Sequence, residues 1–269
     1  MPLKIVLDVS KSAQENAQSF FSDAKKWRAK AEGTKEGMAR VREKLEEMRA
    51  RAEETKAKAP EKVRKKEWFE KFRWCLTRNG LLVIGGRDAH SNEVIVKRHL
   101  DEKDAYFHAD VFGAPHCVLK IGDQKATPLD LEDAAAFAGV FSSVWKKGVL
   151  SVKVFQAKKS QVTKQAPTGE SVGRGAFMIY GKRDWFEPRL SLGWGVQRVG
   201  EGYRALCGPL SCVKAHAEHV IEIIPGKKSK SDMAKAYSSF LKKRKEPILI
   251  SLDELVAALP TGEFSSKTS

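Results

Sequence analysis

Cysteine is scarce in this sequence, and long apolar runs are missing from it. The 269 residues include four cysteines, none of them in a Cys-x-x-Cys spacing. So few cannot form the disulfide framework of a small secreted protein, and a reducing compartment is expected. No run of eighteen apolar residues occurs, and residues 1–14 lack a long apolar stretch behind basic residues. We therefore expect no membrane span, no secretory signal and a cytoplasmic location.

Catalytic signatures are also missing. The sequence contains no Gly-x-Ser-x-Gly, no Walker-type loop and no Gly-x-Gly-x-x-Gly behind a strand, so an enzyme is not expected. His108, Asp110 and His116 carry groups that metals accept, but their spacing matches no ligand pattern. We expect no catalytic residue, no metal and no cofactor.

Negative charge is in deficit. Lys and Arg number 49 against 34 Asp and Glu, which gives a net charge of +15. Residues 1–66 hold 18 basic and 11 acidic residues, and residues 226–269 hold 9 and 5, so the excess lies mainly in the two terminal segments. This balance favours a polyanionic partner, although an ordinary solvated surface would also explain it.

Two apolar seams mark the N-terminal segment, and Gly33 and Gly37 lie between them. Each seam steps by three and four residues, which is typical of a coiled coil. We expect an antiparallel helical hairpin, a short coiled-coil arm, over residues 1–59. The members of the two seams are Ala13, Ala17, Phe20, Ala24, Trp27 and Ala31, then Met38, Val41, Leu45, Met48 and Ala52.

Short strand-like segments dominate residues 60–225. The aromatic run 68–74 is expected to close a helix, residues 81–84 form a short buried strand, and Asp88 or Ser91 can cap a helix to about His99. Asn79-Gly80 predicts a tight turn, and Thr127-Pro128 predicts the start of a helix. Further strands alternate with few helices, which predicts an α+β fold. We expect a mixed, mostly antiparallel sheet domain with packed helices over 60–225. A basic helical tail and C-terminal extension should follow over 226–269.

A glycine-rich, basic stretch precedes one of these strands. Gly173, Arg174 and Gly175 belong to it, and Lys182 and Arg183 follow closely. Backbone amides in such loops can face phosphate oxygens, arginine can bind them through two nitrogens, and lysine neutralises them. Trp185 offers a flat face for an unstacked base. Ordinary hairpin turns around a buried tryptophan are the alternative.

The sequences of several segments closely resemble the C-terminal NFACT-R domain of the NFACT family of ribosome-associated quality control proteins. The similar segments are 67–74 (EWFEKFRW), 82–89 (LVIGGRDA), 92–93 (NE), 96–98 (VKR), 106–114 (YFHADVFGA), 167–170 (PTGE), 175–179 (GAFMI) and 181–183 (GKR). The resemblance implies an RNA-binding module that acts on tRNA, ribosomal RNA or the large ribosomal subunit. The family's N-terminal half has no counterpart here, so we expect a stand-alone form or a separate chain that supplies that half.

These observations give one set of candidate site residues and one alternative function. The candidates for RNA binding are Arg87, Arg98, Lys164, Thr168, Gly173, Arg174, Lys182, Arg183 and Trp185. The resemblance also makes Asp88, His108 and Asp110 candidates for a polar site, while an internal network of ion pairs and hydrogen bonds explains them equally well. The alternative function is a protein-interaction adaptor that uses the helical hairpin without binding RNA directly.

Overall fold

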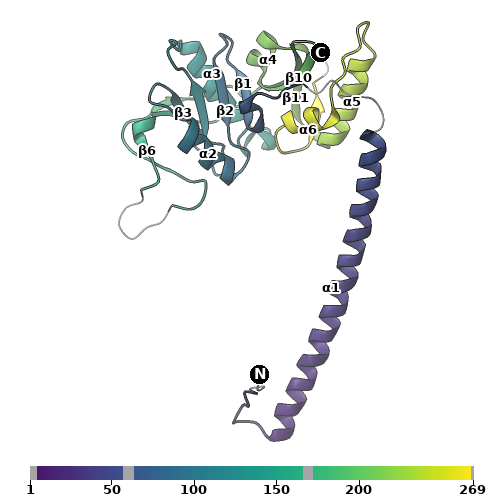
Figure 1. Ribbon diagram of the computed structural model, residues 1–269. Coiled ribbons are helices and arrows are strands. Elements are labelled where there is room, and N and C mark those ends of the chain that lie inside the picture. Colours follow the sequence, from purple (N-terminus) through teal and green to yellow (C-terminus); the bar gives the residue numbers. More distant parts are fainter. Residues whose placement is uncertain (1–4, 57–63, 166–171, 268–269) are drawn as a thin grey trace. The chain divides into compact units, whose positions relative to one another are not determined.

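The chain divides into two compact units, Met1–Pro60 and Glu61–Ser269. A computed structural model describes residues 5–56, 64–165 and 172–267, with side chains described for 5–49 in the first of these ranges. Figure 1 shows the elements of both units. No helix in the described ranges is both long and apolar enough to cross a membrane.

The first unit is dominated by one helix, α1 (Ala13–Lys56), which is 44 residues long. The expected helical hairpin is therefore wrong (Figure 1). Gly33 and Gly37 both lie inside the helix, where a glycine costs only about 1 kcal/mol relative to alanine, and the range contains no proline. Ala31 and Met38 are also seven residues apart, so the two seams share one heptad register through Thr34. Nothing in this sequence forces a turn.

The second unit contains a six-stranded sheet in the order β1-β2-β4-β3-β5-β8. Every neighbouring pair in it is antiparallel. Asn79-Gly80 turns the chain between the first two strands, with Gly80 at a φ of 95° that favours glycine. The strands are β1 (Arg73–Leu76), β2 (Leu82–Gly85), β3 (Ala105–Ala109), β4 (Cys117–Lys120), β5 (Val154–Lys158) and β8 (Asp184–Phe186).

A second, four-stranded antiparallel sheet has the order β10-β9-β11-β12, and a two-stranded ribbon pairs β6 with β7. The bounds are β6 (Val162–Thr163), β7 (Met178–Ile179), β9 (Leu192–Val199), β10 (Gly202–Pro209), β11 (Glu218–Lys228) and β12 (Phe264–Ser266). The expected helix over the aromatic run 68–74 is wrong beyond its first turn. A 3-10 turn covers Trp68–Lys71, and β1 then begins at Arg73, where strand pairing buries Trp74.

Helix α3 (Pro128–Val140) joins the two sheets in one core. Its residues from Asp133 to Val140 are buried, and it contacts strands of both sheets. Thr127 caps the helix and Pro128 occupies its first turn, as the sequence predicts. A Cβ atom on Gly85 would lie 2.8 Å from the ring of Phe137, so this strand needs glycine for the close approach. The other helices are α2 (Ala89–His99), α4 (Leu210–His216), α5 (Lys230–Lys242) and α6 (Leu252–Ala258).

The segment expected as a separate tail packs into the same unit. Strand β11 runs past residue 225 to Lys228, so the sheet continues through the expected boundary. Helix α5 buries Met233, Tyr237 and Leu241, and the rings of Tyr237 and Trp194 lie 4.4 Å apart. Lys235 and Lys242 of α5 are exposed because the apolar face of the helix fills the core, whereas Lys230 at its start is half-buried. The α+β fold with mostly antiparallel sheets is confirmed.

Candidate functional site

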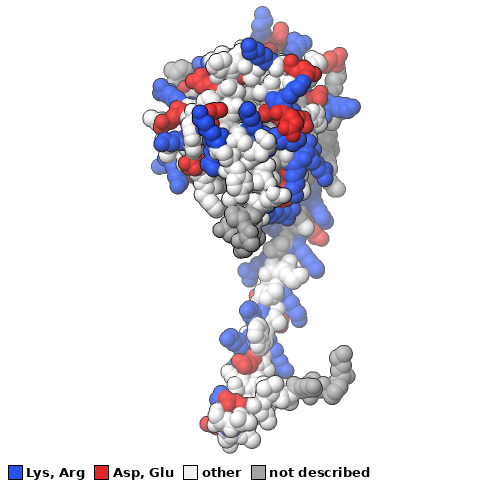
Figure 2. Space-filling view, turned by 90° about the vertical axis from the view of Figure 1, so that its left-hand side faces the viewer, with Lys and Arg blue, Asp and Glu red and all other residues white. Residues whose placement is uncertain are grey.

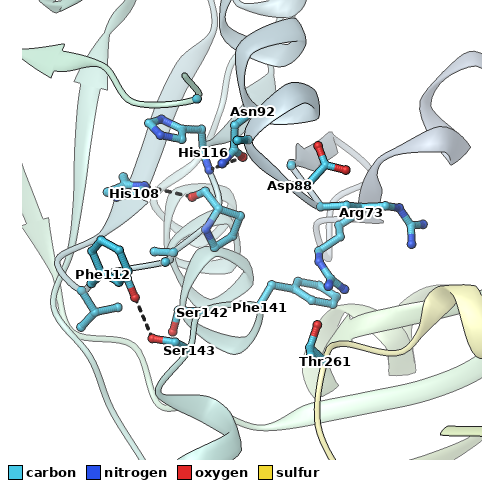
Figure 3. Close-up of a pocket in the computed structure, with 18 of the residues that line it drawn as sticks. Arg73, Asp88, Asn92, His108, Phe112, His116, Phe141, Ser142, Ser143 and Thr261 are labelled. Atoms are coloured by element: carbon cyan, nitrogen blue, oxygen red, sulfur yellow. Dashed lines mark hydrogen bonds between the residues drawn. The ribbon is translucent and has the colours of Figure 1, made fainter. Parts of the chain in front are cut away.

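A cleft of about 590 Å³ lies in the second unit. It is found where the turn after β2, the loop between β3 and β4, the end of α3 and the glycine-rich loop come together (Figure 3). The charged and histidine side chains that line it are Arg73, Arg87, Asp88, His108, His116, Lys146 and Arg174.

The turn from β2 into α2 forms one wall, and its geometry follows from Gly86. A Cβ atom on Gly86 would lie 1.8 Å from Oδ1 of Asn92, so no other residue fits there. Oδ1 of Asn92 accepts a hydrogen bond from the backbone N–H of His116 at 3.1 Å. Asp88 caps α2, since its carboxylate accepts the backbone N–H of Ser91 at 2.8 Å. Residues 85–88, Gly-Gly-Arg-Asp, therefore fix the position of the first turn of α2 against the loop before β4.

The glycine-rich loop rests directly on the first turn of α2. Gly175 has a φ of 77°, and a Cβ atom there would lie 2.6 Å from Cα of Ala89. A guanidinium nitrogen of Arg174 lies 3.1 Å from Nδ1 of His90. The loop therefore contacts α2 through its backbone, and Arg174 stands at the cleft.

Lys164 holds the same loop from the side of β6. Its ammonium group donates to the carbonyl oxygen of Gly173 at 2.9 Å and lies 3.7 Å from a carboxylate oxygen of Glu93. It also lies 4.9 Å from the ring centre of Phe177. Lys164 and Gly173 therefore help to position Arg174, and neither lines the cleft.

Three cations gather where the cleft meets α6, and main-chain carbonyls are their hydrogen-bond partners. Arg87 donates to the carbonyl oxygens of residues 71, 72 and 257 at 3.2, 2.9 and 2.7 Å. Lys230 donates to that of Leu259 at 3.0 Å, and Arg73 reaches the same oxygen at 3.5 Å. The guanidinium of Arg73 lies 4.7 Å from the ring centre of Phe141 (Figure 3).

No carboxylate forms a salt bridge with these cations. Within the described ranges, neither Arg73, Arg87 nor Lys230 has such a partner. Burial and the nearby charge of Arg87 lower the pKa of Arg73 to about 10. Burial, followed by the charges of both arginines, lowers the pKa of Lys230. Asp88 is the sole acidic residue among those that line the cleft; burial lowers the pKa of Arg87, and the charge of Asp88 opposes this effect only in part. The arrangement is therefore suited to an anion.

The two histidines of the cleft are uncharged at neutral pH. Their rings stack at 4.6 Å, and Nδ1 of His116 lies 2.6 Å from the hydroxyl of Tyr106. Nδ1 of His108 lies 3.0 Å from the carbonyl oxygen of Pro115. Burial lowers the pKa of both side chains, that of His116 to about 3. Across the described residues, no group of three or more His, Cys, Asp or Glu side chains is placed to hold a metal ion.

The structure brings some of the predicted site residues together and separates others. Arg87, Asp88, His108 and Arg174 line the cleft. Asp110 lines a different hollow with Trp185, whose side chain is 50% exposed on the edge strand β8.

The remaining predicted residues lie elsewhere. Lys182 lines a third hollow beside β5. Arg183 lies with its guanidinium 4.7 Å from the ring centre of Phe155 and donates to the carbonyl oxygen of Ile179. Arg98 is exposed near the end of α2, roughly 14 Å along the helix from Ala89. Thr168 lies outside the described residues.

Sequence reasoning missed several members of the cleft. Arg73 and Lys146 contribute positive charge, and Phe112 stands fully exposed at the rim. Ser143 donates a hydrogen bond to the carbonyl oxygen of Phe112 at 2.8 Å (Figure 3). The sequence did contain a signal for Arg73, because an arginine at the start of a buried strand is rare unless a partner or a function accounts for it. No sequence signal points to Lys146.

Net charge alone does not locate the site. Figure 2 shows Lys and Arg interspersed with Asp and Glu over the visible face of the second unit, with no large area of one sign. The cleft differs from such a surface because one of its unpaired cations, Arg73, is half-buried. This local arrangement, more than the total of +15, singles it out.

Comparison with known proteins gives a consistent result over the core. Residues 71–181 match the family model described as "NFACT protein RNA binding domain". The archaeal Rqc2 homolog aRqcH of Methanocaldococcus jannaschii is 33% identical over 204 residues, which cover 75% of this chain and 30% of that protein. The human ribosome quality control complex subunit NEMF is 42% identical over 129 residues, covering 48% of this chain and 12% of that protein. The chain thus spans less than a third of the length of either relative.

A solved structure also aligns with part of the chain. The C-terminal part of the fibronectin/fibrinogen-binding protein from Streptococcus suis shares 19% identity and a TM-score of 0.38, covering 48% of this chain and 49% of that one. A likeness this weak carries no argument. The expected resemblance to an NFACT-R domain is confirmed over residues 71–181 by the family match.

Proposed function

We propose that this chain, whose residues 71–181 are an NFACT-R domain, binds RNA phosphates at the cleft and serves ribosome quality control. The RNA would be a tRNA or RNA of the large ribosomal subunit, met in the cytoplasm. The relatives named as ribosome quality control factors support this role. The relatives are longer than this chain, and a separate chain that supplies the remaining part would be a further partner.

The observation that carries the proposal is the unpaired positive charge of the cleft. Arg73 and Arg87 are held at its wall by main-chain carbonyls and ring contacts. Arg87 is exposed, but Arg73 is half-buried, and burying a cation without a carboxylate is costly. An RNA phosphate would lower this cost, because it supplies the missing negative charge and accepts hydrogen bonds from both faces of the cleft.

Arg174 and Lys146 are the two cleft cations best placed to reach such a phosphate. Arg174 lies on the glycine-rich loop, Lys146 follows α3, and both are exposed. Neither forms a salt bridge with a carboxylate in the described ranges. They are therefore better targets for a test than Arg73 or Arg87, whose removal would disturb main-chain contacts.

The test is binding of labelled tRNA to the full chain at two salt concentrations. The variant Lys146→Gln/Arg174→Gln removes two cleft charges, and Lys147→Gln/Lys182→Gln removes two charges outside it. We expect steep salt dependence in the wild type, a slope smaller by about 1.5 in the cleft variant, and an affinity loss of at least about tenfold. The control should lose much less.

Equal losses in the two variants would show that binding follows total charge and would contradict the cleft as the site. No tRNA binding by the wild type would leave the alternative of a protein-interaction adaptor. In that case, partner binding should survive treatment with RNase. The observation that favours an adaptor is the exposed apolar seam of α1.

A further inference from the structure

Helix α1 carries an apolar seam that contacts no other part of its own unit. In the range 13–49 every residue except Asn16 is exposed. The exposed fractions of Trp27, Val41 and Met48 are 61%, 68% and 63%. Because the seam keeps one register through Thr34, it forms a single stripe on a helix about 66 Å long. A stripe of this length is typical of a helix that pairs with another helix.

Charges are sorted by side around this stripe. In heptad notation the seam residues occupy positions a and d, with Met38 and Leu45 at a. The flanking position e is basic four times in succession, at Arg28, Lys35, Arg42 and Arg49. The flanking position g adds Lys30 and Lys44, with Asp23 as its acidic member. The outer positions b, c and f carry the remaining acidic residues of this range, Glu15, Glu32, Glu36, Glu43, Glu46 and Glu47, together with three basic residues, Lys25, Lys26 and Arg40.

A second copy of α1 is a poor partner for this surface. In a parallel pair, position g of one helix faces the next e of the other, which sets Lys30 against Lys35 and Lys44 against Arg49, while Asp23 meets Arg28. In an antiparallel pair, e faces e, and the basic e residues of the two helices meet. Both arrangements therefore place more like-charged than opposite contacts beside the seam.

Side-chain size also argues against self-pairing in parallel. Position a is alanine at residues 17, 24 and 31, whereas position d holds Phe20 and Trp27. Like positions meet in a parallel pair, so layers of small residues would alternate with layers of two large rings. A partner with large apolar residues opposite the alanines would fill these layers evenly.

We propose that α1 docks an amphipathic helix of another protein, one with leucine-like side chains in its seam and acidic residues on both flanks. The basic e and g positions then select the partner by charge, and the apolar stripe supplies the contact area. RNA is a weaker candidate for the same surface, because it would leave the apolar stripe between the two basic flanks uncovered. This inference is independent of the cleft.

The test uses two synthetic five-heptad helices with leucine at a and d, one with glutamate and one with lysine at e and g. Binding of each labelled peptide to the full chain is measured by fluorescence anisotropy at low and high salt. We expect the glutamate peptide to bind at least about tenfold more tightly at low salt. The preference should shrink as salt rises.

Two matched charge variants assign the effect to the flanks of the seam. Arg28→Glu/Lys35→Glu/Arg42→Glu should reverse the preference toward the lysine peptide. Lys25→Glu/Lys26→Glu/Arg40→Glu makes the same change of net charge at outer positions and should leave the preference in place. Trp27→Ser/Leu45→Ser should abolish binding of both peptides, with helix content checked by circular dichroism.

Three results would overturn the proposal. They are equal affinity for the two peptides, the same response in both charge variants, and unchanged peptide binding in the seam variant. Displacement of the glutamate peptide by single-stranded RNA, with RNA binding kept in the seam variant, would assign the flanks to nucleic acid instead. None of these outcomes depends on the cleft, so the two proposals fail separately.

Discussion

Replacing Gly175 by alanine should disable the cleft while leaving the fold intact. The glycine-rich loop lies on α2 at this residue, with φ at 77° and backbone atoms of Ala89 close by. A methyl group there has no rotamer by which to avoid them. The loop must either move or distort the first turn of the helix.

The magnitude can be worked out from the contacts. Alanine in the left-handed region costs about 1 kcal/mol more than glycine. A contact of 2.6 Å to Cα and 2.7 Å to the carbonyl oxygen of Ala89 adds repulsion that a shift of about 1 Å must relieve. The opposing contacts, Arg174 with His90 and Lys164 with Gly173, are exposed and contribute about 1 kcal/mol each. The backbone strain and this repulsion together act against about 2 kcal/mol from these two contacts, so we expect the loop to shift.

Gly173→Ala is the matched control, because nothing lies within 4 Å of a Cβ atom at that position. Hydrogen exchange of residues 172–181, followed by mass spectrometry, should speed up in Gly175→Ala and stay unchanged in Gly173→Ala. The free energy of unfolding should change by less than about 1 kcal/mol in either variant, since this loop is outside the core. Affinity for tRNA should fall in Gly175→Ala alone.

Unchanged exchange together with unchanged tRNA affinity in Gly175→Ala would refute the reasoning about the loop. Faster hydrogen exchange with unchanged affinity for tRNA would separate the position of the loop from its role in RNA binding. The loop would then be held as described, but Arg174 would not contact the RNA.

Two further predictions concern stability. Arg64 binds both carboxylate oxygens of Glu70, at 2.7 and 2.6 Å, and also pairs with Glu254. Arg64→Met should therefore lower the free energy of unfolding in urea by about 3 kcal/mol, whereas Arg40→Met, at an exposed ion pair, should lower it by less than about 0.5 kcal/mol. Equal losses in the two variants would contradict the role of burial. His116 has a folded pKa of about 3, below its unfolded value, so its stabilising contribution is present above about pH 6.5 and is lost as the pH falls. The free energy of unfolding should drop by about 2 kcal/mol between pH 8 and pH 5 on this account, and His116→Gln should lack that part of the slope.

Local signals predicted much of the second unit. Asp88 caps α2, Thr127 with Pro128 begins α3, and Asn79-Gly80 turns the chain between two paired strands, all as expected. Each depends on a few neighbouring residues whose side chains contact their own backbone. Such contacts form wherever the fold places the segment, so a sequence predicts them well.

The N-terminal helix was mispredicted because one local signal was given too much weight. Gly33 and Gly37 lower helix propensity, but the register of the apolar residues crosses both without a break. A turn would have required a change of register or a proline, and the segment has neither. The continuous heptad spacing of the apolar residues was the stronger predictor of one long helix, and the same spacing produces the stripe that would receive an acidic partner helix.

The cleft could not be predicted in the same way, because its character comes from main-chain groups that are remote in sequence. The guanidinium of Arg87 reaches the carbonyl oxygen of Ala257, 170 residues away, and Arg73 shares the carbonyl oxygen of Leu259 with Lys230. A sequence shows that an arginine is present but not whether its partner is a carboxylate or a carbonyl. That difference decides the chemistry, since a carboxylate would cancel the charge, whereas a carbonyl holds the arginine in place and leaves its charge available to a phosphate.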